Sequence, residues 1–164
     1  GSAMMPPTLA QTPYELVIEL HRAEDLPEMD LGGATGGKCD AFGKAEFMGI
    51  SKESEVIQSQ SPDWTTLPQH PGVPEMIRLD FGMPEGGKLP SNIVTVGIWD
   101  RDEAPLDPPD VVGITRLNLQ DILANPKKWS RPFWVYFYGA PESLTAGQHL
   151  VDLGSFFSDL FSSE

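Results

Sequence analysis

Short apolar runs separated by turn residues constrain the fold of this chain more than any other sequence feature. Residues 14–21 place Tyr14, Leu16, Ile18 and Leu20 at alternate positions, which is the pattern of a β-strand with one buried face. The other candidate strands are residues 40–47, 55–59, 75–81, 92–99, 111–119 and 133–138. Because no long helical pattern alternates with these runs, they indicate an antiparallel sheet protein and not a βαβ fold.

The residues between the runs support an all-β sandwich with Greek-key connections. The 16 glycines and 16 prolines are scattered without a period, as in a chain with many turns. Residues 121–124 predict a single helical turn, which Asn125 and Pro126 end. Trp64, Trp99 and Trp134 are expected to be core or corner residues.

We expect one main domain. Residues 1–4 are typical of a remnant of tag removal, the domain is predicted over residues 5–154, and residues 155–164 are predicted to be a C-terminal tail or a short amphipathic helix. Residues 149–153 are a candidate last strand. The single cysteine, Cys39, excludes an internal disulfide, which favours a cytoplasmic location.

The charge of the chain limits its partners. Eleven basic and 24 acidic residues give a formal net charge of −13, which repels nucleic acid and anionic lipid headgroups. We therefore expect no nucleic-acid partner. Membrane binding is possible only if something local, such as bound cations, reverses the field at the contact surface.

A carboxylate-rich loop follows the most apolar run. Within residues 98–113, Asp100 and Asp102 project to one side of an extended chain, about 7 Å apart. Asp30 and Asp40 flank a second, glycine-rich loop. If the two loops are neighbours, their carboxylates form one cup, and Ca²⁺ suits flexible oxygen-rich loops better than Mg²⁺ does.

Four motifs in order give these loops a family resemblance. Residues 22–30 precede a glycine-rich loop and Asp40-Ala-Phe; residues 61–64 read Ser-Pro-Asp-Trp, residues 99–102 read Trp-Asp-Arg-Asp, and residues 110–113 read Asp-Val-Val-Gly. Over most of its length the chain resembles the C2 domain family, a group of calcium- and phospholipid-binding modules.

The resemblance implies an eight-stranded antiparallel C2 β-sandwich with a short helix near residues 120–125. The positions that match the family's calcium-binding aspartates are Asp30, Asp40, Asp100, Asp102 and Asp110, with Asp107 as an alternative for the last. Leu31 and Leu106, near the loop tips, are the expected membrane contacts. The cofactor implied is Ca²⁺.

The function that the resemblance implies is calcium-dependent binding to anionic phospholipid membranes. The module would belong to a larger membrane-trafficking or vesicle-fusion protein, peripheral on the cytosolic face of membranes, with other proteins of such a complex as further partners. It would not be an enzyme. Residues 133–141 also resemble the closing segment of ferlin C2 domains.

Three departures from the family pattern keep an alternative open. Residues 32–38 lengthen the first loop, and Pro105, Pro108 and Pro109 fix the path toward Asp107 and Asp110 in the second. The lysine-rich strand that binds phosphoinositides in many C2 domains has no counterpart, so phosphoinositide specificity is not predicted. The alternative is a calcium-independent C2 domain that acts as a protein-interaction scaffold.

Two other classes fit poorly. The acidic loop lacks the glycine at position six and the glutamate at position twelve of an EF-hand. The Asp-x-Asp at 100–102 resembles the catalytic pair of haloacid-dehalogenase-like phosphatases, but that fold requires parallel strands that alternate with helices.

Overall fold

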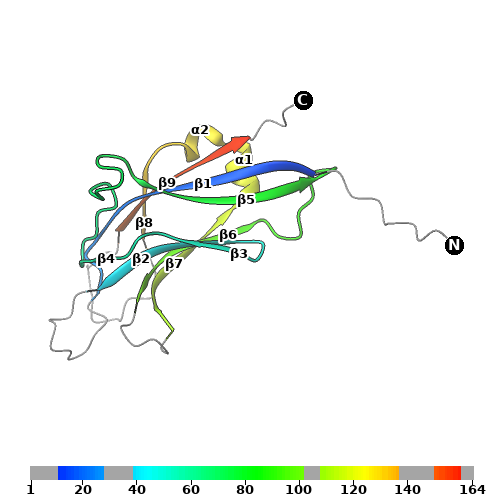
Figure 1. The fold of residues 1–164 in the computed structure, drawn as a ribbon. Coiled ribbons are helices and arrows are strands. Elements are labelled where there is room, and N and C mark those ends of the chain that lie inside the picture. Colours follow the sequence, from blue (N-terminus) through cyan, green and yellow to red (C-terminus); the bar gives the residue numbers. More distant parts are fainter. Residues whose placement is uncertain (1–10, 28–38, 102–107, 137–149, 160–164) are drawn as a thin grey trace.

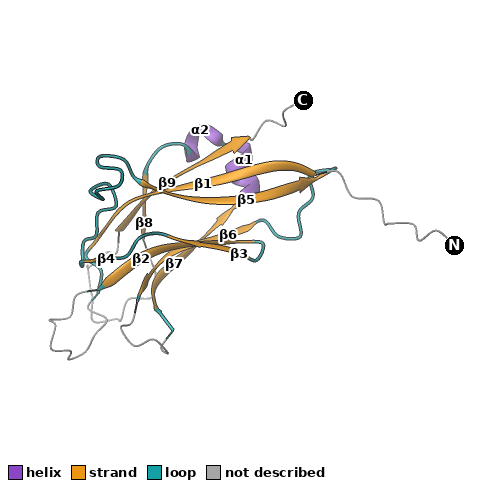
Figure 2. Cartoon of the chain, in the orientation of Figure 1, coloured by secondary structure: helices purple, strands orange, loops and turns teal. Residues whose placement is uncertain are grey.

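The protein is a sandwich of two antiparallel sheets (Figures 1 and 2). The computed structural model describes residues 11–27, 39–101, 108–136 and 150–159, with side chains up to residue 135. One sheet has the order β5 (Glu75–Pro84), β1 (Gln11–Glu24), β9 (Leu150–Asp159), β8 (Phe133–Tyr136). The other has the order β3 (Ile50–Glu53), β2 (Asp40–Phe47), β6 (Ile93–Asp100), β7 (Asp110–Asn118), and β4 (Ile57–Gln58) also pairs with β2.

The second sheet is four strands wide although it contains five strands. β3 pairs with residues 44–47 of β2, whereas β4 pairs with Asp40 and Ala41, so both occupy the same edge of β2. Each sheet therefore has four strand positions. This arrangement confirms the predicted eight-stranded antiparallel sandwich.

The core lies between the sheets and follows the alternation predicted from the sequence. Leu16, Ile18 and Leu20 of β1 join Val94 and Ile98 of β6 in one cluster, and all five are at most 1% exposed. Burying one such side chain contributes about 1.5–3 kcal/mol.

Trp64 closes one side of this core. Its side chain is fully buried, and its indole N–H donates to the Glu55 carbonyl over 2.9 Å. Its backbone N–H donates to the carbonyl of His21. Because both polar hydrogens are bonded, this tryptophan is the core residue that the sequence predicts.

The C-terminal segment differs from the prediction. Residues 155–159 belong to strand β9, which runs through the expected boundary at residue 154 and pairs with β1 and β8. The prediction of a helix or a tail over these residues is wrong. β1 is a central strand, so its backbone N–H and C=O groups require a partner strand on each edge, and this requirement overrides the helical spacing of the phenylalanines.

Two short helices connect β7 to β8. Asn118 caps α1 (Leu119–Ala124), and its side-chain oxygen accepts hydrogen bonds from the backbone N–H groups of Gln120 and Asp121. α2 (Pro126–Trp129) follows directly. The predicted helix near residues 120–125 is confirmed. No helix in the described part of the chain is both long and apolar enough to span a bilayer.

Candidate functional site

Three of the predicted ligand residues lie at strand termini on one end of the second sheet. Asp40 is the first residue of β2, Asp100 the last of β6, and Asp110 the first of β7. These strands are neighbours and antiparallel, so the three termini meet, and Asp100 lies opposite both Ala41 and Asp110. We call Asp40, Asp100 and Asp110 the aspartate end.

The Asp100 side chain is hydrogen-bonded to the backbone at this end. Its side chain is nearly buried, at 2% exposure of the residue, and its Oδ1 accepts a hydrogen bond from the Asp40 N–H over 2.7 Å. The Arg101 N–H in turn donates to the Asp40 carbonyl over 2.9 Å. A buried carboxylate without hydrogen-bond donors is costly. The hydrogen bond from the Asp40 N–H offsets part of this cost, and it also connects the end of β6 to the start of β2.

A one-residue bulge decides which β7 residue faces Asp100. Ile98 pairs with Gly113, but Trp99 pairs with Val111, so the register shifts by one residue across Val112. Without the shift Val111 would lie opposite Asp100. The bulge instead places Asp110 there, with its side chain exposed. Bulges commonly redirect side chains in this way beside functional sites.

Arg101, the cation that follows Asp100, has a partner outside the aspartate end. Its Nη2 lies 2.7 Å from the Glu53 carboxylate, and its Cζ lies 4.6 Å from the centre of the Phe42 ring. Sequence reasoning missed this contact because Glu53 is 48 residues from Arg101, and no local pattern links them. Arg101 is thus ion-paired with Glu53.

Two aromatic residues support β2 and β6 from the outer face of the sheet. Phe42 and Trp99 stack with a centroid distance of 6.4 Å, and the Lys44 Nζ lies 5.2 Å from the Trp99 ring centre. Trp99 is 8% exposed but lies outside the main core cluster. Trp134, at 36% exposure beneath Arg22, is a surface residue, so the prediction of a core or corner position is wrong for it.

The remaining predicted site residues are Asp30, Asp102, Asp107, Leu31 and Leu106, and they lie outside the described residues. Among the residues that the structure describes, no group of three His, Cys, Asp or Glu side chains is arranged to hold a metal ion. The role of the aspartate end as part of a donor set stays a prediction. Its chemistry, carboxylate oxygens only, fits Ca²⁺.

Comparison with known proteins identifies the fold. No family model and no curated protein matches the sequence. A solved structure of two C2 domains of Extended-Synaptotagmin 2 matches with a TM-score of 0.64 at 19% identity, over 96% of this chain and 46% of that one. A calcium-bound structure of the same two domains gives 0.63 at 20% identity, over 92% and 47%.

A single-domain structure agrees with this match. A C2 domain of plant Extended Synaptotagmin 1, solved by itself, gives a TM-score of 0.58 at 16% identity, over 91% of this chain and 97% of that one. The chain thus spans about half of the two-domain structures and nearly all of the single domain. Its fold is that of C2 domains, which confirms the resemblance predicted from the sequence; the ferlin subtype stays a prediction.

Proposed function

We propose that this C2-fold chain binds anionic phospholipid membranes in a calcium-dependent manner, as a module of a larger membrane-trafficking or fusion protein. The observation that supports the proposal is the meeting of Asp40, Asp100 and Asp110 at one end of one sheet. The other predicted aspartates lie in residues 28–38 and 102–107, which adjoin Asp40, Asp100 and Asp110 in the sequence.

Electrostatics gives the proposal its mechanism. Carboxylates gathered at one end repel each other and repel anionic lipid, in a chain whose net charge is already −13. The aspartate end would hold the ion together with Asp30 and Asp102, with Asp107 as the alternative to Asp110. Bound calcium would supply the positive charge and the open coordination positions that lipid phosphate requires.

The rigid attachment of Asp100 suits this role. Its hydrogen bond to the Asp40 N–H fixes the carboxylate before any ligand arrives, which lowers the entropic cost of binding. Leu31 and Leu106 would then add apolar contact with the bilayer, about 2–3 kcal/mol each at most. Extended-Synaptotagmin 2, one of the proteins with the same fold, has been solved with calcium bound.

Vesicle sedimentation tests the proposal directly. Vesicles rich in phosphatidylserine should bind the chain in millimolar calcium and lose it in excess chelator. Asp100→Asn with Asp110→Asn should remove the calcium-dependent part, whereas Asp80→Asn with Asp121→Asn, which lie outside the aspartate end, should not. Calcium-dependent binding that survives the first pair of substitutions would contradict the assignment of the site.

A calcium-independent scaffold is the second candidate function. The net charge of −13 favours it, because an acidic surface opposes docking to anionic lipid wherever no positive charge offsets it. For this candidate, calcium should change neither the unfolding temperature nor vesicle binding.

A further inference from the structure

Positive charge collects at the end of the domain opposite the aspartate end. Five of the eleven basic residues lie within residues 85–92 and 116–132, where only Glu85 and Asp121 are acidic, so the two segments carry a formal charge of +3. We call these five the basic end: Lys88, Arg116, Lys127, Lys128 and Arg131. A local surplus of this kind in a strongly acidic chain indicates an anionic partner.

The fold brings the two segments together. The Leu119 N–H donates to the Asn92 carbonyl over 2.7 Å, and the Gln120 amide donates to the Asn92 side chain over 3.1 Å. α1 in turn contacts α2. Figure 1 shows both helices on the side of the molecule away from β4 and the start of β2, so the charges of the domain are separated along its length.

The cations at this end are available to a partner. Lys127 and Arg131 are exposed and form no ion pair with the described residues. Lys128 has only a 3.6 Å contact with Asp121 and lies 4.8 Å from the Trp129 ring centre. Trp129 packs edge-on against Phe133, which attaches this basic turn to the domain.

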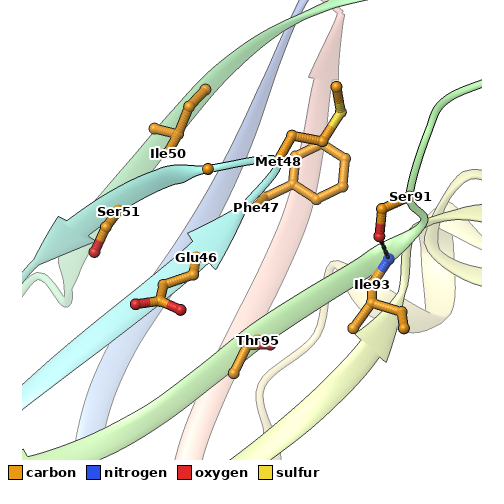
Figure 3. Close-up of a pocket in the computed structure, with 9 residues that line it drawn as sticks. Glu46, Phe47, Met48, Ile50, Ser51, Ser91, Ile93 and Thr95 are labelled. Atoms are coloured by element: carbon orange, nitrogen blue, oxygen red, sulfur yellow. Dashed lines mark hydrogen bonds between the residues drawn. The ribbon is translucent and has the colours of Figure 1, made fainter.

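A groove lined by both polar and apolar residues borders the basic end. A cavity of about 420 Å³ lies between the β2–β3 turn and the start of β6, and its lining includes Met48, Ser91 and Ile93 (Figure 3). Met48 and Ile93 are 40% and 53% exposed. Met48 and Gly49 have φ values of 49° and 77°, which places Met48 at the tip of a tight two-residue turn.

We propose that the basic end and this groove form a second docking surface, for an anionic phospholipid bilayer, which acts without calcium. The cations come from separate segments and not from the walls of one groove, so they suit a broad anionic surface. Met48 and Ile93 would enter the interfacial region of the bilayer, and with the proposed calcium site the domain would contact membranes at both ends.

Sedimentation with phosphatidylserine vesicles in excess chelator tests this surface by itself. The chain should bind at low salt, where charges act over distances beyond about 10 Å, and should be released at high salt. Lys127→Gln with Arg131→Gln should weaken binding roughly 25-fold, on the basis of about a fivefold loss for each basic residue near the surface. Met48→Ser should weaken it further.

Matched controls separate this surface from net charge and from the proposed calcium site. Lys52→Gln with Arg78→Gln removes the same charge elsewhere and Val73→Ser removes another exposed apolar side chain, so both should bind as the unmodified chain does. Excess chelator itself excludes a contribution from the proposed calcium site, because no calcium is free to bind there. The proposal is overturned if the unmodified chain does not sediment with the vesicles in chelator at low salt, or if the controls lose as much binding. It is also overturned if the basic-end substitutions change only self-association or the binding of polyglutamate.

Discussion

The aspartate end and the basic end of the sandwich differ in how they hold their charges. Asp40, Asp100 and Asp110 sit at strand termini, where ladder pairing fixes their backbone and the Asp40 N–H holds the Asp100 carboxylate. Lys127 and Arg131 extend from a short helix and the turn after it. Fixed carboxylates suit coordination, which depends on geometry, whereas long mobile cations suit a diffuse anionic surface, which depends mainly on net charge.

The largest expected effect is an increase in the free energy of unfolding on calcium binding, which should depend on residues of the aspartate end and not on those of the basic end. At a calcium concentration of about 100 times the dissociation constant, binding adds about 2.7 kcal/mol to the free energy of unfolding. Asp110→Asn should remove most of this gain, and Lys127→Gln should keep it. Thermal unfolding with calcium and with chelator measures the difference. An equal gain in both variants would remove the contrast between the two ends.

The next effect separates two aspartates of the same end. In chelator, Asp100→Ala should lower the free energy of unfolding by about 1–3 kcal/mol, because the Asp40 N–H loses its acceptor in a buried setting. Asp110→Ala removes an exposed side chain and should change stability by no more than about 0.5 kcal/mol. Urea unfolding curves of the two variants test this. Equal losses would mean that Asp100 is not the structural member of the pair.

A smaller effect is expected from the cap of α1, beside the basic end. Asn118→Ala removes the acceptor for the first backbone N–H groups of the helix, which should cost about 1 kcal/mol. Asn118→Asp keeps an acceptor oxygen and is the matched control. The calcium-dependent gain in stability should persist in both variants. Its loss would show that the two ends are not independent.

The smallest effect concerns pH and Glu75, whose carboxylate accepts the Glu55 N–H over 2.9 Å. Burial raises the pKa of Glu75 above its usual value of 4.5; the Glu55 carboxylate also raises the pKa, against the Glu55 N–H and His70. Because the folded pKa is raised, the stability linked to protonation is present below about pH 4.5 and is lost as the pH rises through the folded value.

The free energy of unfolding of Glu75→Gln, relative to that of the unmodified chain, should therefore increase as the pH rises from about 3.5 to about 7. The gain is small because the side chain is partly exposed. Urea unfolding at the two pH values measures it, with exposed Glu85→Gln as the control. A gain that decreases toward neutral pH would contradict the direction given for the pKa.

Much of the fold was predictable because its strands alternate cleanly. The runs at 40–47 and 92–99 coincide with observed strands to within a residue, and the runs at 14–21 and 75–81 lie inside the longer strands β1 and β5. Burial of one face imposes the period of two that made these strands recognisable. Strand β9 was predicted only in part. Its phenylalanine-rich half has the spacing of a helix, and only the need of β1 for a partner explains its pairing.

The candidate site was predicted in composition and partly in place. The sequence predicted one cup of carboxylates on the condition that the two loops are neighbours, and the pairing of β6 with β2 and β7 brings the strand termini at Asp40, Asp100 and Asp110 together. Their role as metal ligands stays a prediction. The Arg101–Glu53 contact was not predictable, because its two residues meet only after β2, β3 and β6 have paired.

The sequence by itself determined which residues can serve as donors and which faces are buried, because side-chain chemistry and period-two alternation are local properties. Only the tertiary structure decided that Asp110, and not Val111, lies opposite Asp100. That choice depends on one bulged residue between β6 and β7. A one-residue shift in register reflects the packing of the whole sheet, which no local pattern encodes.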